Sequence, residues 1–101
     1  MDKTKWLNLS RTQQLGNIAS EISRAYHWQE NNDYPKRQRA LERLLELLDL
    51  TLNDQRWKYG LKEIARLREV VSAWFCDEKT FDISPKELEH FCTDFVLKNT
   101  R

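Results

Sequence analysis

The feature that most constrains this chain is the spacing of its apolar side chains, which recur at intervals of three and four residues. The clearest case is a leucine stripe at Leu41, Leu44, Leu45, Leu48 and Leu52. At 3.6 residues per turn, this spacing places the leucines on one side of a helix. Asp33 is the expected N-cap, because Pro35 follows at a position where a first turn tolerates a missing N–H. The pattern predicts a helix from Asp33 to about Leu52.

Two neighbouring segments show the same period. Ser10 and Gln13 have the spacing of a capping box, and the apolar residues after them predict a helix that ends near residue 30. A further helix is expected over residues 57–75. Gly60 weakens its first turn, so the alternative is a start at residue 61.

The strongest local signal lies near the end of the chain. Ser84 and Pro85 supply an N-cap and a proline at the first helical position, and Glu87 follows at the third. An apolar stripe then continues through Leu88, Phe91, Cys92, Phe95 and Val96. These residues predict a fourth helix.

The four segments together predict an all-α fold. With two glycines and two prolines in 101 residues, the chain lacks the turn residues of a typical all-β protein. Short polar connections favour antiparallel neighbours, so we expect an up-down four-helix bundle. Residues 10–101 form the expected single domain. Residues 1–9 are expected to be an N-terminal arm that places Trp6 and Leu7 on the bundle.

Composition and motifs argue against several classes of function. The net charge is +1, so any affinity for nucleic acid or membranes must come from local clustering. We expect no signal peptide and no membrane span, and we expect Cys76 and Cys92 to be reduced thiols in the cytoplasm. Neither His27 nor His90 is placed like an oriented catalytic base. No catalytic residues, metal ligands or cofactor are therefore predicted.

Three apolar side chains fall outside the stripes of their own helices. These residues are Trp28, Leu47 and Leu50. They predict a homodimer interface, and the alternative is that they cover the ends of a thick bundle. Arg68 is the opposite case, a cation close to an apolar stripe. We expect its stem to lie along the core with its head in solvent, or else a buried pair with Asp49 or Glu46.

Basic residues cluster at the start of the leucine helix and along the helix that follows it. The residues are Lys36, Arg37, Arg39, Lys58, Lys62 and Arg66. The first three lie where the helix dipole favours acids, and aromatic residues adjoin the others, a pattern that can hold phosphates and stack bases. The alternatives are a solvated face balanced by glutamates, or a surface for an acidic protein.

Two runs, residues 39–51 and 64–70, resemble small uncharacterised prokaryotic helical proteins. That resemblance implies a helical fold and no activity. More distantly, the bundle is similar to HEPN domains, whose ribonuclease members carry an Arg and a His at a wider spacing. Arg24 and His27 are three positions apart, so this ribonuclease activity is not implied.

The sequence therefore predicts a non-enzymatic protein-interaction module that associates with itself. The alternative is a nucleic-acid or nucleotide-binding module that uses the basic surface.

Overall fold

The chain is all-helical over the residues that the computed structural model describes, 2–57 and 60–76, and these residues contain no strand. The helices are α1 (Lys3–Asn8), α2 (Arg11–Glu30), α3 (Tyr34–Leu52), the short 3₁₀ helix η1 (Gln55–Trp57) and α4 (Leu61–Phe75). The helix predicted after Ser84 lies outside the described residues, as do Lys58 and Cys92. The all-α class is confirmed, and the complete four-helix arrangement stays a prediction.

Local hydrogen bonds set both ends of the loop between α2 and α3. Asn32 has a φ of 57°, a left-handed conformation that asparagine tolerates better than most residues. Asn32 N donates to Gln29 O at 3.1 Å and Asp33 N to Trp28 O at 2.8 Å, the hydrogen bonds of a Schellman motif. The Asp33 side chain then accepts from Lys36 N and begins α3. The predicted N-cap is confirmed.

The capping box at the start of α2 is also confirmed. Gln13 N donates to Ser10 Oγ at 3.1 Å, and Ser10 N donates to Gln13 Oε1 at 2.9 Å. The third predicted helix begins at the later of its two alternatives, Leu61, with Gly60 as an N-cap that makes no side-chain hydrogen bond.

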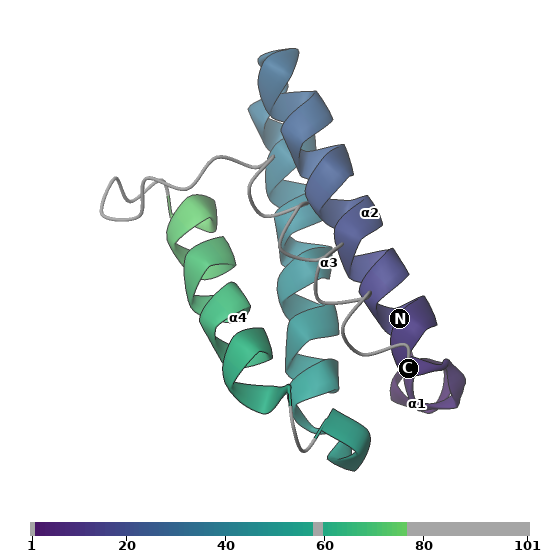
Figure 1. Cartoon of the computed structure of the whole chain (residues 1–101). Coiled ribbons are helices and arrows are strands. Elements are labelled where there is room, and N and C mark those ends of the chain that lie inside the picture. The colour runs from purple at the N-terminus through teal and green to yellow at the C-terminus, as the bar shows by residue number, and fades with distance from the viewer. Residues whose placement is uncertain (1, 58–59, 77–101) are drawn as a thin grey trace.

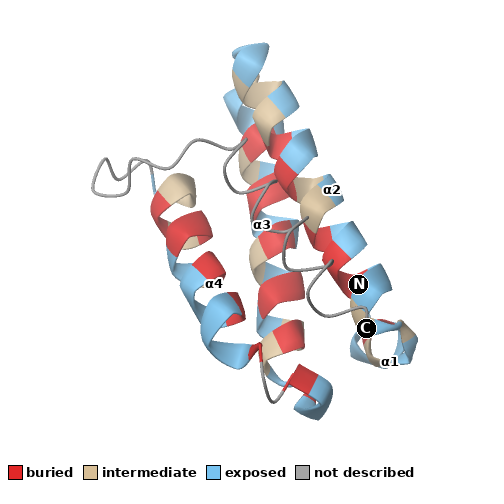
Figure 2. Ribbon diagram, viewed as in Figure 1, coloured by how far each residue is buried: buried red, intermediate tan, exposed pale blue. Residues whose placement is uncertain are grey.

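Helix α3 lies between α2 and α4 and packs against both (Figure 1). Its buried residues therefore occupy a wide stripe, and the buried surfaces of α2 and α4 face it (Figure 2). The core is a single cluster whose largest members are Trp6, Leu15, Ile18, Ile22, Leu41, Leu44, Leu47, Leu48, Trp57, Ile64 and Leu67.

Helix α1 contributes more than the predicted arm suggests. Asp2 caps this helix, and the side chain of Trp6 is fully buried in the core, while Leu7 is half-buried. The Trp6 indole Nε1 donates to Thr51 Oγ1 at 3.0 Å. One tryptophan thus fixes α1 to the end of α3.

Candidate anion-binding groove

A basic groove lies along one side of the α2–α3 pair. Arg24 and Trp28 from α2, and Lys36, Arg39 and Arg43 from α3, line a hollow of about 250 Å³. Arg24 and Trp28 are four residues apart, as are Arg39 and Arg43, so each pair shares one side of its helix. We call these five residues the basic groove.

Two carboxylates accompany the four cations of the basic groove. Glu21 Oε1 lies 2.7 Å from Arg24 Nη1, and Glu21 Oε2 lies 3.4 Å from Arg43 Nε. Asp33 Oδ2 lies 3.5 Å from Lys36 Nζ. No carboxylate of the described residues lies within ion-pair distance of the exposed Arg39. The groove therefore keeps an excess of positive charge.

Trp28 forms the aromatic end of the basic groove. Lys36 Nζ lies over the Trp28 ring, 4.4 Å from its centroid, and the His27 ring meets Trp28 edge-on with centroids 4.7 Å apart. The half-buried indole therefore holds Lys36, in the first turn of α3, beside the loop between α2 and α3 through a cation–π contact. An aromatic ring is thus part of the same surface as the cations.

Arg37 does not belong to the exposed basic surface, which corrects the sequence prediction for this residue. It is 4% exposed, and its Nη1 and Nη2 donate to Gln29 Oε1 at 3.2 Å and Gln38 Oε1 at 3.0 Å. Gln29 Oε1 also accepts from Trp74 Nε1 at 2.8 Å. Arg37 thus links α3 to the end of α2, and Gln29 links the same group to α4.

The other predicted basic residues do not join the basic groove. Lys62 and Arg66 are exposed on α4, which contributes no residue to the groove, and Lys58 lies outside the described residues. Sequence reasoning missed Arg24 and Arg43. Their signal was a four-residue spacing to Trp28 and Arg39, but only the packing of α2 on α3 shows that the two pairs meet.

Trp28 lies apart from Leu47 and Leu50, the other two residues of the predicted interface. Leu47 is 6% exposed and belongs to the core, so its side chain is not part of an exposed interface surface. Leu50 is half-buried against the same core. Trp28 contacts Lys36, which is eleven residues before Leu47, or about 16 Å along α3. Leu47 is buried because α3 has a helix on each side.

Arg68 forms an ion pair with Asp49 on the protein surface. Its Nε and Nη2 donate to the two carboxylate oxygens, and the side chains of Arg68 and Asp49 are 39% and 52% exposed. Asp49 is one of the two predicted partners, but the pair is not buried. The hydrogen bond that Arg68 donates to Asp49 is the main cause of the raised pKa of the Arg68 guanidinium.

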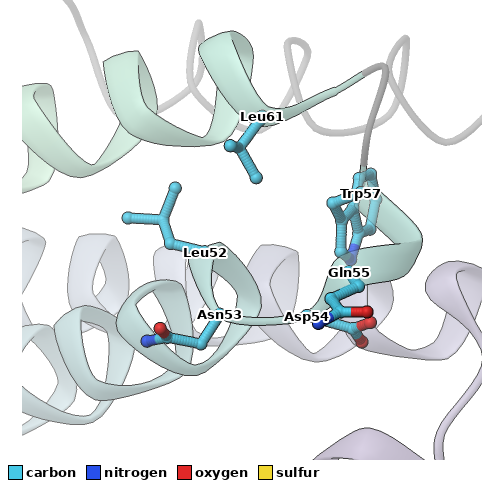
Figure 3. A pocket seen from close by; sticks show the side chains of 6 residues that line it. All are labelled: Leu52, Asn53, Asp54, Gln55, Trp57 and Leu61. Carbon is cyan, nitrogen blue, oxygen red and sulfur yellow. The ribbon is translucent and has the colours of Figure 1, made fainter.

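A second hollow lies at the opposite end of α3, where η1 leads to α4 (Figure 3). It has a volume of about 280 Å³, and Leu52, Trp57 and Leu61 supply its apolar lining. Leu61 is one of the exposed large apolar residues of the described chain.

Three observations bear on the class of protein. Within residues 2–57 and 60–76, no three potential metal-ligating side chains come together. No helix in that part of the chain has the length and apolarity needed to cross a membrane. Comparison with protein-family models, with curated proteins and with solved structures found no match.

Proposed function

We propose that the protein is a non-enzymatic binding module whose basic groove holds the phosphates of single-stranded RNA. The observation that carries the proposal is the convergence of Arg24, Lys36, Arg39 and Arg43 on one hollow. The whole chain has a net charge of only +1, so this convergence is a local feature of the fold rather than a result of composition. Local clusters of this kind supply the electrostatic part of nucleic-acid binding.

The shape of the basic groove favours an extended polyanion. Lys36, Arg39 and Arg43 follow one side of α3 over about 10 Å, which suits successive phosphates better than one compact anion. Three of the four cations are guanidinium groups, which can bind phosphate oxygens in pairs. Trp28 at the end of this line gives the combination of cations and an aromatic ring that is typical of single-strand binding surfaces.

Self-association through Trp28, Leu47 and Leu50 has less support. A twofold interface brings the same surface of each copy together. Between Trp28 and Leu50 that surface carries Arg39 and Arg43, so like charges would face each other at its centre. An anionic partner meets no such repulsion.

The proposal retains the finer predictions about fold and location. We propose that the segment from Ser84 onward completes an antiparallel four-helix bundle, and that the protein works in the cytoplasm. The free thiol of Cys76 is consistent with a reducing compartment. A homodimer remains a prediction that light scattering after size-exclusion chromatography tests directly.

Fluorescence anisotropy with a labelled single-stranded RNA of about 12 nucleotides tests the function. The double variant Lys36→Ala, Arg39→Ala removes two cations of the basic groove, and Lys62→Ala, Arg66→Ala removes the same charge from α4. We expect the first variant to bind RNA about tenfold more weakly. Its salt slope, the slope of log affinity against log salt concentration, should become shallower by about 1.4. The second variant should change little in either quantity.

Equal losses in the two variants would show that only overall charge matters and would overturn the proposal. Absence of salt-dependent RNA binding by the unmodified protein would do the same. Polyglutamate is the competitor that tests selectivity. If it displaces the RNA at equal charge concentration, the partner is an acidic protein rather than RNA.

A further inference from the structure

Glu21 occupies an unusual position in the basic groove, because it contacts two of the four cations at once. Its carboxylate lies 2.7 Å from Arg24 Nη1 and 3.4 Å from Arg43 Nε. The Glu21 side chain is only 12% exposed, although it lies between two arginines at the surface. The carboxylate thus holds the place where a ligand phosphate could bridge the two guanidinium groups.

We infer that Glu21 is a built-in counter-ion that limits the affinity of the basic groove for phosphates. The inference rests on the proposed function and identifies the residue that sets its strength. With Glu21 in place, a ligand meets no competing carboxylate of the described residues at Arg39, but it must compete for Arg24 and Arg43. Tight binding therefore requires several phosphates acting together, and a single phosphate group binds weakly.

The alternative role for Glu21 would be to orient the two arginines for a ligand. An orienting carboxylate works by locking the side chains that it holds. The side chains of Arg24 and Arg43 are 52% and 49% exposed, and the contact to Arg43 is long. Since both guanidinium groups reach into solvent and are not locked, the geometry favours competition over orientation.

The experiment compares Glu21→Gln with Glu69→Gln in the same RNA anisotropy assay. Both variants remove one negative charge, but Glu69 is exposed on α4 and does not line the groove. We expect Glu21→Gln to bind RNA three- to tenfold more tightly at low salt, with a salt slope steeper by about 0.7. Glu69→Gln should change the affinity by less than about twofold, because its charge is distant and screened.

Inorganic phosphate added as a competitor gives a second readout. It should displace RNA from Glu21→Gln at a lower concentration than from the unmodified protein. Thermal unfolding followed by circular dichroism establishes that Glu21→Gln folds, and Glu21→Ala replaces it if it does not.

The outcomes separate this inference from the proposed function. If the unmodified protein binds RNA through Lys36 and Arg39, but Glu21→Gln and Glu21→Ala bind with equal or lower affinity, the counter-ion role is wrong and the function stands. If neither the unmodified protein nor the Glu21 variants bind RNA in a salt-dependent way, both ideas fail.

Discussion

The indole Nε1 of Trp57 donates a hydrogen bond of 2.8 Å to the side-chain oxygen of Gln14, and both side chains are fully buried. The amide nitrogen of Gln14 donates to Trp6 O at 2.9 Å and to Asp54 Oδ2 at 3.0 Å. One glutamine on α2 thereby contacts α1, η1 and Asp54 in the link between α3 and η1. Its polar atoms are all satisfied, which is what allows a glutamine in the core.

Replacing Gln14 with leucine should strongly destabilise the protein. Leucine keeps most of the volume but leaves the Trp57 N–H, the Trp6 carbonyl and one Asp54 oxygen without this partner. Trp6 O keeps its hydrogen bond from Leu9 N, and Asp54 Oδ2 keeps those from Arg56, so the main loss is at the buried Trp57 N–H. A buried polar group that loses its partner costs about 1–3 kcal/mol, and we expect a loss of about 2 kcal/mol in the free energy of unfolding. Urea denaturation measures this change.

The matched control for this variant is Gln55→Leu, which makes the same substitution at an exposed position in η1. Its free energy of unfolding should change by less than about 0.5 kcal/mol. Equal effects at positions 14 and 55 would show that the buried network does not stabilise the fold.

Replacing Trp6 with alanine should destabilise the protein as much as a large-to-small substitution elsewhere in the core. Trp6 is fully buried, so Trp6→Ala should lower the free energy of unfolding by about 3–5 kcal/mol. Leu7→Ala is the control, because Leu7 is half-buried on the same helix. This replacement should lower the free energy of unfolding by much less. A loss below about 1 kcal/mol for Trp6→Ala would mean that α1 is a dispensable arm after all.

The sequence predicted α2 and α3 well because their limits are set by local chemistry. Ser10 and Gln13 cap α2, and Asp33 with Pro35 begins α3, so short-range hydrogen bonds decide where these helices start. Helix α1 was missed because six residues with few apolar side chains give no periodic signal. Its stability depends on the burial of Trp6 among residues distant in the sequence, which local patterns do not report.

The candidate site was predictable only in part, for the same physical reason. Lys36 and Arg39 follow from the basic start of α3, and the structure places both in the groove. Arg24 joins them only through the packing of α2 on α3. Arg37 was assigned to the basic surface from its place at the start of α3, but its guanidinium is buried and donates to Gln29 and Gln38.

Acid should weaken the fold through Asp54. Hydrogen bonds from the Arg56 side chain are the main cause of the lowered pKa of Asp54, which falls from 3.8 to about 2. Burial of the carboxylate opposes this shift, and a hydrogen bond from Gln14 lowers the pKa further. Because the unfolded chain binds this proton at a higher pH, the contribution of ionised Asp54 to the free energy of unfolding is fully present above about pH 4. It is lost as the pH falls through about 2 and amounts to about 2 kcal/mol.

Urea denaturation between about pH 5 and pH 2 measures this dependence, and Asp54→Asn serves as the comparison. The variant should be less stable near neutral pH, and its stability should change less over the acidic range. If both proteins lose stability in parallel, the acid sensitivity lies in other carboxylates.

The pair of Arg68 and Asp49 should contribute little to stability, despite its bidentate geometry. Both side chains reach solvent, so water screens their attraction and ordering them costs entropy. A double-mutant cycle with Arg68→Ala and Asp49→Ala should give a coupling energy below about 1 kcal/mol, and salt should reduce it. A buried pair would behave differently, because removal of one partner alone would cost about 3–5 kcal/mol. Urea denaturation of the two single variants therefore decides whether this ion pair behaves as the surface pair that the structure shows.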